Sequence, residues 1–231
     1  MRRIDRIVIL TGAGISAESG LGTFRDEGGL WSQHRIEDVA TPEAFARNPD
    51  LVHRFYNARR IQAASAKPNA AHDALARLQS DFPGEVVLVT QNVDGLHEKA
   101  GAQAIHMHGE LSRALCVSCG HRWDAPPEMV VGEPCTACRA PTARPDIVWF
   151  GEMPYHMDDI FDALQTCDLF AAIGTSGQVY PAAGFVQEAR MAGAATVELN
   201  LRDSDMSHAF DDHITGLASK TVPAWVDRLL A

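Results

Sequence analysis

Short runs of apolar, mostly β-branched residues recur along the chain and constrain its fold more than any other feature. The runs are Arg6–Leu10, Val86–Val89, Leu169–Ile173 and Ala195–Leu199. Each is typical of a strand buried on both faces of a parallel sheet. Because helical patterns separate the runs, the sequence predicts an α/β fold with a doubly wound parallel sheet.

The helices expected between these strands begin with recognisable signals. Thr41 is a candidate N-cap with proline at the first helical position, and Asn69 is a second candidate cap. Pro49 is expected to split the first helical segment in two. The expected helices are Pro42–Ala66, Ala70–Gln79, Pro181–Arg190 and Val222–Leu230.

Residues 112–144 interrupt the alternation of strands and helices. They contain two Cys-x-x-Cys pairs, separated by 15 residues, and little periodicity. This spacing is typical of a zinc site rather than of a disulfide framework. Four thiolates complete a tetrahedral Zn²⁺ and leave no position for a catalytic water, so we expect one structural zinc. The ligands would be Cys116, Cys119, Cys135 and Cys138, and Cys167 is expected to be a buried, inert thiol.

Charge disfavours several classes of partner. The formal net charge is −10 and the isoelectric point is about 5.4, which argues against binding to nucleic acid or to an anionic membrane. Basic and acidic side chains are balanced within the cysteine-rich segment, which disfavours a non-enzymatic zinc-ribbon module. The apolar run Ile7–Leu10 is too short for a secretory signal, so we expect a cytoplasmic protein.

A glycine-rich turn follows the first strand. Gly12–Ala17 matches the pattern G-x-G-x-x-G/A, which allows backbone N–H groups to approach a pyrophosphate. A turn that merely links a strand to a helix is the alternative. The glycines continue through Gly20, Gly22 and Gly28–Gly29, which predicts a mobile loop closing over a ligand.

Polar residues follow the other predicted strands. Thr90–Gly95 carries amides and a carboxylate that could hold ribose hydroxyls, although an Asn/Asp turn capping a short helix is an equal alternative. In a strand, His106 and His108 would share a face, where a histidine suits general-base catalysis. A structural histidine or a metal pair is the alternative. Gly174–Gly177 and Asn200 end the last two strands.

Six motifs, in order and over nearly the whole chain, resemble those of the sirtuins. They are GAGISAESG…TFR at Gly12–Arg25, TQNVDGLH at Thr90–His97, HMHGEL at His106–Leu111, the paired Cys-x-x-Cys, VWFGE at Val148–Glu152 and GTSGQVYPAAGF at Gly174–Phe185. The sequence is most similar to bacterial sirtuins of the class that also removes acidic acyl groups.

The resemblance implies an NAD-dependent protein-lysine deacylase. One sirtuin domain, 1–231, would combine a Rossmann-like NAD-binding core (about 1–35, 70–110 and 145–231) with a small domain. The small domain would hold a helical module (about 36–69) and a four-cysteine zinc ribbon (about 111–144). In the family's reaction the acyl oxygen attacks the nicotinamide ribose and nicotinamide leaves. The resulting O-alkylamidate is hydrolysed to free lysine and O-acyl-ADP-ribose.

Site residues carry over from the family's motifs. His108, which directly precedes Gly109, would be the general base, and Asn92 would also be catalytic. The residues implied to bind NAD are Gly12, Ala13, Gly14, Ser16, Ala17, Thr23, Phe24, Arg25, Trp31, Gln91, Asn92, Asp94, Gly174, Thr175, Ser176, Asn200, Leu201, Arg202 and Ala218.

The resemblance also implies how substrate binds. Val148, Phe150 and Gly151, facing Gly177–Tyr180, would pair with acylated-lysine proteins as extended peptides. Tyr56 and Arg59 match the YxxR pattern of sirtuins that remove succinyl and malonyl groups, although an ordinary amphipathic helix is the alternative. We expect a monomer. A nicotinamide oxidoreductase and an ADP-ribosyltransferase using the same NAD site are the rival activities.

Overall fold

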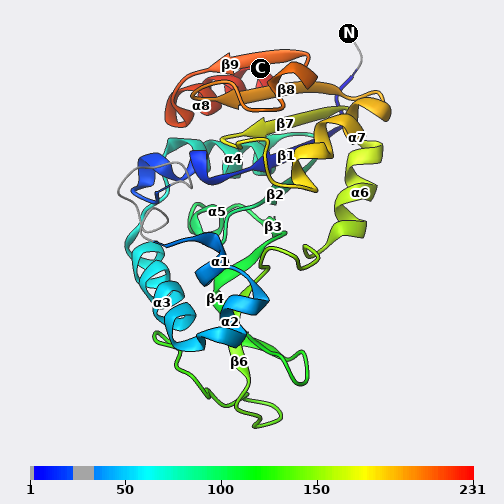
Figure 1. Cartoon of the computed structure of the whole chain (residues 1–231). Coiled ribbons are helices and arrows are strands. Elements are labelled where there is room, and N and C mark those ends of the chain that lie inside the picture. The colour runs from blue at the N-terminus through cyan, green and yellow to red at the C-terminus, as the bar shows by residue number, and fades with distance from the viewer. Residues whose placement is uncertain (1–2, 23–33) are drawn as a thin grey trace.

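A six-stranded parallel sheet forms the centre of the protein. The computed structural model describes residues 3–22 and 34–231 (Figure 1). The strands lie in the order β3-β2-β1-β7-β8-β9, and every neighbouring pair is parallel. Their bounds are β1 Arg6–Thr11, β2 Glu85–Thr90, β3 Ala104–His106, β7 Leu169–Ile173, β8 Ala195–Asn200 and β9 Asp212–Thr215. The strand order reverses between β1 and β7, as in a Rossmann-like sheet, so the predicted fold class is confirmed.

Both faces of this sheet are buried, which explains the continuous apolar runs. In β1, Ile7 and Ile9 face a core shared with α4 (Ala70–Asp81) and α8 (Ala218–Leu230). Val8 and Leu10 face the opposite core, which includes α6 (Met157–Thr166) and α7 (Phe185–Met191). Each strand residue therefore buries apolar surface on one side or the other.

The helix starts follow the capping signals in most cases. Pro49 does split the first helical segment, into α2 (Pro42–Arg47) and α3 (Pro49–Ser65). The Thr41 side chain accepts the Ala44 N–H at 3.0 Å. Asn69 and His72 form a reciprocal capping box at the start of α4. These side chains satisfy backbone N–H groups that have no partner within the helix.

Two predicted helix starts were wrong. The segment after Pro181 begins with a 3-10 turn, η4 (Ala182–Gly184), and α7 starts only at Phe185. The last helix begins at Ala218, four residues before the predicted Val222. Pro223 suggests a helix start, but here it lies in the second turn, where its missing N–H costs one hydrogen bond. Burial of Val222, Trp225 and Val226 stabilises the helix across that position.

A second, antiparallel sheet lies beside the first and holds the cysteine-rich segment. Its order is β5-β4-β6, with β4 at Gly109–Cys116, β5 at Arg122–Asp124 and β6 at Ala143–Ile147. The short helix α1 (Ile36–Val39), α2 and α3 pack against this sheet (Figure 1). The remaining short elements are η1 (Ala13–Ile15), η2 (Ala17–Ser19), α5 (Leu96–Lys99) and η5 (Ser207–Ala209). Within 3–22 and 34–231, no helix is both long and apolar enough to cross a membrane.

Candidate nucleotide and acyl-lysine site

Glycine turns meet where the strand order reverses, at the carboxyl ends of β1 and β7. Gly14 N–H donates to the Gly174 carbonyl at 2.9 Å. A Cβ on Gly12 would lie 2.8 Å from the Gly174 carbonyl oxygen. A Cβ on Gly14 would lie 2.7 Å from the Cα of Gly174. Gly174 has φ +63°, a left-handed conformation that favours glycine. Only glycine allows the two turns to pack this closely. The glycines are therefore needed for packing, whether or not they also contact a pyrophosphate.

The chain after this turn does not continue directly into an α-helix. It forms the 3-10 turns η1 and η2, and Ser16 lies between them. Ser16 Oγ donates to Asp94 Oδ2 at 3.1 Å and accepts from Asn92 Nδ2 at 3.3 Å. Asn92 Nδ2 also lies 3.1 Å from the Gly12 carbonyl oxygen. The ends of β1 and β2 therefore form one buried polar cluster.

Asp94 has a second role within the same cluster. Its Oδ1 accepts the N–H of Leu96, the first residue of the short helix α5, at 3.0 Å, although the N-cap position itself is Gly95. Each carboxylate oxygen thus has a protein partner of its own, and the contact of this Asn/Asp segment with ribose stays a prediction.

His108 lies in the turn between β3 and β4 with one ring nitrogen engaged. Its Nδ1 is 3.1 Å from the Gln91 carbonyl oxygen, so Nδ1–H donates and Nε2 keeps a lone pair. Burial lowers the pKa of His108, and the bond to Gln91 opposes that shift. A neutral imidazole with a free Nε2 is the form that acts as a general base near neutral pH.

His106 and His108 do not share a strand face, which corrects the sequence expectation. β3 ends at His106, and β4 begins at Gly109. Gly109 has φ +79°, and a Cβ there would lie 2.1 Å from the Asp146 carbonyl oxygen. The chain must therefore turn between the two histidines, and the extended pattern stops.

The ends of β7 and β8 approach each other farther along the same edge. Asn200 Nδ2 donates to the Thr175 carbonyl at 2.7 Å, and its Oδ1 accepts the Leu201 N–H at 3.0 Å. Glu18 in η2 accepts hydrogen bonds from Ser219 N–H and Oγ–H, which ties the first turn to the start of α8.

Part of the predicted NAD site falls on the segment 23–33. Of the predicted NAD-binding residues, Thr23, Phe24, Arg25 and Trp31 lie outside the described residues. Most of the predicted loop over the ligand, including Gly28–Gly29, lies outside them as well. These assignments stay predictions from the sequence motifs.

Tyr56 and Arg59 lie together on α3, as their spacing predicted. The Tyr56 side chain is fully buried and its oxygen accepts the Trp149 indole N–H at 3.0 Å. The Arg59 guanidinium carbon lies 5.8 Å from the Tyr56 ring centroid. Burial raises the pKa of Tyr56 to about 12, so the phenol keeps its proton as a donor. Burial also lowers the pKa of Arg59, but the neighbouring Tyr56 and Asp94 oppose this shift, and Arg59 remains a cation.

Trp149 is itself fixed by a partly buried ion pair between Arg144 and Glu152. The two guanidinium NH groups of Arg144 donate to the two carboxylate oxygens of Glu152, each at 2.7 Å. The guanidinium carbon lies 3.7 Å from the Trp149 ring centroid, and Glu152 Oε2 accepts the Trp149 backbone N–H at 2.9 Å. Sequence reasoning assigned no role to this cluster, although the VWFGE motif contains two of its members.

The residues predicted to flank the peptide substrate lie beside His108, the predicted general base. Val148 N–H donates to the His108 carbonyl at 2.9 Å, and Phe150 N–H donates to the Ala40 carbonyl at 3.0 Å. The Phe150 side chain is partly exposed, and Gly151 has φ +91°. Tyr180, in the opposite flanking segment, is exposed.

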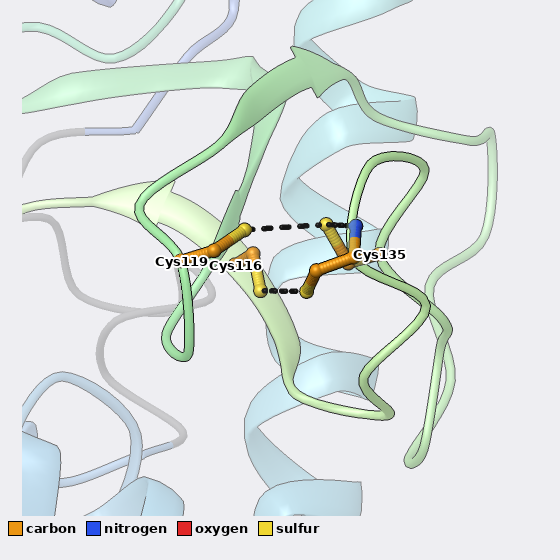
Figure 2. A group of neighbouring side chains, drawn as sticks. Cys116, Cys119 and Cys135 are labelled. Atoms are coloured by element: carbon orange, nitrogen blue, oxygen red, sulfur yellow. Dashed lines mark hydrogen bonds between the residues drawn. The ribbon is translucent and has the colours of Figure 1, made fainter.

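The four cysteines converge as the spacing predicted (Figure 2). All four sulfur atoms lie within 4.8 Å of one another. The Sγ atoms of Cys116 and Cys138 are 3.6 Å apart, and those of Cys119 and Cys135 are 3.7 Å apart. Two sulfurs on a tetrahedral zinc lie about 3.8 Å apart, because each Zn–S bond is about 2.3 Å. The donor set therefore fits one structural zinc, and Cys167 is buried away from it, as expected.

The Sir2 family profile matches residues 12–181. The chain belongs to the Sir2 family. It is 56% identical to an NAD-dependent protein deacylase of Caulobacter vibrioides, over 100% of this chain and 99% of that protein. It is 54% identical to the NAD-dependent protein deacylase of Bdellovibrio bacteriovorus, over the same shares of the two chains.

Solved sirtuin structures agree with this fold. A Sir2 homologue in complex with NAD has a TM-score of 0.90 and 35% identity, covering 98% of this chain and 90% of that one. A Sir2 variant with a deacetylated p53 peptide and 3′-O-acetyl ADP-ribose has a TM-score of 0.81 and 27% identity, covering 99% and 93%.

In this sirtuin, the carboxyl edge of the sheet suits a dinucleotide. Such ligands bind outside the carboxyl ends of strands at the point where the strand order reverses. Gly12, Gly14 and Gly174 keep side chains out of that point, and Asn92 and Asn200 supply amides on either side of it. The roles of the individual residues remain predictions that follow from the family's motifs.

Proposed function

We propose that this sirtuin is an NAD-dependent protein-lysine deacylase that removes acetyl groups and the acidic succinyl and malonyl groups. NAD supplies the ADP-ribosyl group that accepts the acyl group, with nicotinamide as the leaving group. The observation that carries the proposal is the position of one partly buried cation, Arg59. Its guanidinium carbon lies 5.8 Å from the ring centroid of Tyr56 on the same helix, so a cation and a phenol are placed together as a candidate reader of an acidic acyl group.

His108 supplies the base in this proposal. Its Nδ1–H is held by the Gln91 carbonyl, so the ring orientation is fixed and Nε2 is the atom that takes a proton from a ribose hydroxyl. Asn92 and Asp94 orient the nicotinamide ribose and carboxamide, because their side chains are already fixed by Gly12 and Ser16.

Tyr56 and Arg59 select the acyl group. A guanidinium can hold a distal carboxylate with two charge-assisted bonds, and a phenol can add a third. Trp149 donates to the Tyr56 oxygen, which leaves the phenolic hydrogen for the substrate. An acetyl group has no distal carboxylate, so it needs neither donor.

The remaining parts of the proposal concern substrate and cellular setting. An acylated peptide pairs its backbone with Val148–Gly151 and Gly177–Tyr180, so sequence selectivity is broad. The protein acts as a cytoplasmic monomer without nucleic acid, which agrees with its net charge of −10. Its NAD-binding core is 1–35, 70–110 and 145–231, and the small domain is 36–69 with 111–144.

The test compares matched acetyl-lysine and succinyl-lysine peptides, with and without NAD, and identifies products by mass. We expect NAD-dependent loss of both groups with formation of nicotinamide and O-acyl-ADP-ribose, and no product with His108→Ala. Formation of NADH without deacylation would indicate an oxidoreductase. Protein-bound label from labelled NAD would indicate an ADP-ribosyltransferase. Loss of acetyl alone would reject the acidic specificity.

A further inference from the structure

Two histidines separated by one residue hold adjacent carbonyl groups of the same loop. His106 Nδ1 lies 3.0 Å from the Asn92 carbonyl oxygen, and His108 Nδ1 lies 3.1 Å from the Gln91 carbonyl oxygen. Met107 between them is fully buried, and its N–H donates to the Thr90 carbonyl at 3.1 Å. The proposed base and His106 are therefore fixed to one short segment, the loop that follows β2.

Asn92 is restrained at three further points besides its carbonyl group. Its side-chain amide donates to Gly12 and to Ser16, and its backbone N–H donates to Thr90 Oγ1 at 3.0 Å. These contacts hold the side chain and the amide side of the residue. The hydrogen bond from His106 holds the carbonyl of Asn92, which belongs to the peptide group that follows this residue. It therefore fixes the backbone dihedral angle ψ of Asn92.

His106 needs both of its ring hydrogens in this arrangement. Its second nitrogen, Nε2, lies 3.1 Å from Glu98 Oε1. A carbonyl oxygen and a carboxylate both accept, so only a doubly protonated imidazole can serve both partners. The His106 side chain is 9% exposed, so this is a buried cation paired with a half-exposed carboxylate.

The groups around His106 favour that charge. Burial lowers the pKa of His106, but the hydrogen bond and charge of Glu98, with a contribution from Glu110 on β4, outweigh it and raise the pKa above its usual value. His97 on α5 is the neighbouring titratable base and remains neutral in the buried interior. On its outer side His106 lines a cavity of about 530 Å³. There Arg122 pairs with Asp146 and Arg113 pairs with Asp124, and His156 Nδ1 lies 3.6 Å from Asp159.

We infer that His106 is a positioning residue for deacylation: it fixes Asn92 through the carbonyl bond, and Glu98 keeps it in the form that can do so. The role rests on the proposed function and extends it to a residue that contacts no substrate. It also predicts a pH response. A neutral His106 has one hydrogen, and the Glu98 carboxylate draws that hydrogen to Nε2, which releases the Asn92 carbonyl.

Two substitutions separate the two nitrogens. His106→Asn places an amide N–H where Nδ1 lies, so it keeps the hydrogen bond to the Asn92 carbonyl and loses the one to Glu98. His106→Gln places an amide N–H where Nε2 lies, so it keeps the hydrogen bond to Glu98 and loses the one to Asn92. We expect kcat/KM of the first variant to stay within about threefold of the native value. The second should fall by about tenfold or more, mainly in kcat, as expected for one lost hydrogen bond to a positioned group. Equal losses in both variants would overturn the inference.

Glu98→Gln tests the pH response without changing His106. The amide can rotate and donate to Nε2 of a neutral ring, which leaves the remaining ring hydrogen on the Asn92 carbonyl. The native enzyme should lose kcat as pH rises through the raised pKa of His106, and the variant should lose less over the same range. If kcat fell equally with rising pH in the native enzyme and in Glu98→Gln, the proposed role of Glu98 would be overturned.

Amide hydrogen exchange of residues 88–96, measured without NAD, reads the position of the loop directly. Exchange should be faster in His106→Gln than in the native protein, and close to native in His106→Asn. This readout does not depend on turnover. If the native protein removed no acyl group, the proposed function would fail, while the exchange rates would still decide whether His106 holds the loop.

Discussion

Arg59 is the residue on which acyl specificity depends most directly. We predict that Arg59→Met lowers kcat/KM for a succinyl-lysine peptide by about a hundredfold or more, because a bidentate, charge-assisted contact is lost at a partly buried side chain. Activity on the matched acetyl peptide should change by about threefold or less. Steady-state kinetics on the two peptides measure the ratio.

A matched control for this substitution lies on the same helix. Arg54 is exposed on α3 and pairs with Asp50. Arg54→Met removes the same number of charges from the same element and should leave both activities unchanged. If Arg59→Met and Arg54→Met reduced the two activities alike, the loss would be a property of α3 rather than of carboxylate recognition.

His53 is a buried polar residue whose ring nitrogens lack hydrogen-bond partners among the described residues. Its side chain is 2% exposed, and neither ring nitrogen has a hydrogen-bond partner among the residues that the structure describes. We predict that His53→Leu raises the free energy of unfolding by about 1–2 kcal/mol, since it removes two unsatisfied polar atoms and keeps apolar contact with Phe45.

Denaturant unfolding at neutral pH measures this effect, and His208→Leu is its control. His208 is exposed, so the same exchange there should change stability by less than about 0.5 kcal/mol. A loss of stability in His53→Leu would mean that His53 has a polar partner in the folded protein.

The ribbon formed by β4, β5 and β6 is the element most dependent on a bound ion. Its own core is small, with Ala114, Met129 and Ala143 buried between the strands. We predict that Cys135→Ala abolishes the stoichiometric zinc measured by elemental analysis, because three thiolates no longer complete the tetrahedral site. The ribbon should then show rapid amide exchange while the parallel sheet, which has its own two cores, remains protected.

Cys167→Ala provides the comparison for this prediction. Cys167 is buried next to α6, and its thiol donates to the Leu164 carbonyl. This variant also removes one thiol but should keep full zinc content and a protected ribbon. A native level of zinc in Cys135→Ala would show that the quartet is not the metal site.

At the level of elements, local signals predicted most of the fold. Apolar runs located β1, β2, β7 and β8 within about one residue of each end, because strands buried on both faces leave a dense local pattern. Positions that depend on distant contacts were not predictable. The turn after His106 ends at Gly109, whose Cα lies so close to the Asp146 carbonyl of another strand that a Cβ there would be 2.1 Å from its oxygen, and this contact is not visible in the local sequence.

The candidate site also has parts that the local sequence predicted and parts that depend on distant contacts. Residue spacing located the glycine turns and the cysteine quartet, whereas the Tyr56–Arg59 pair was predicted through the resemblance to the family. The contact of Trp149 with Tyr56 joins residues 93 positions apart, and the bond from His106 to Asn92 depends on how β3 pairs with β2. Such pairings depend on tertiary packing, which the sequence pattern does not encode locally.

Across the whole molecule, buried histidines connect stability to pH. The pKa values of four of them are lowered, chiefly by burial: His53, His72, His97 and His108. In the unfolded chain each takes up a proton near pH 6.5. In the folded protein these groups stay neutral to lower pH, so their stabilisation is present above pH 6.5 and is lost as pH falls below it. His106, whose pKa is raised, acts in the opposite sense: its contribution is present below pH 6.5 and is lost as pH rises.

His97 gives the clearest test of this relation. Burial lowers its pKa to about 3, and its Nε2 lies 2.9 Å from Thr11 Oγ1. His97→Gln keeps a polar atom near Thr11 but does not titrate. Between about pH 5.5 and 4, the slope of unfolding free energy against pH should be smaller in the variant by one proton, about 1.4 kcal/mol per pH unit. Denaturant unfolding at several pH values measures the two slopes. His208→Gln makes the same substitution at an exposed position and is the matched control. Parallel curves for the native protein and His97→Gln would mean that His97 accepts its proton in the folded protein, and that its interior position admits water or a carboxylate.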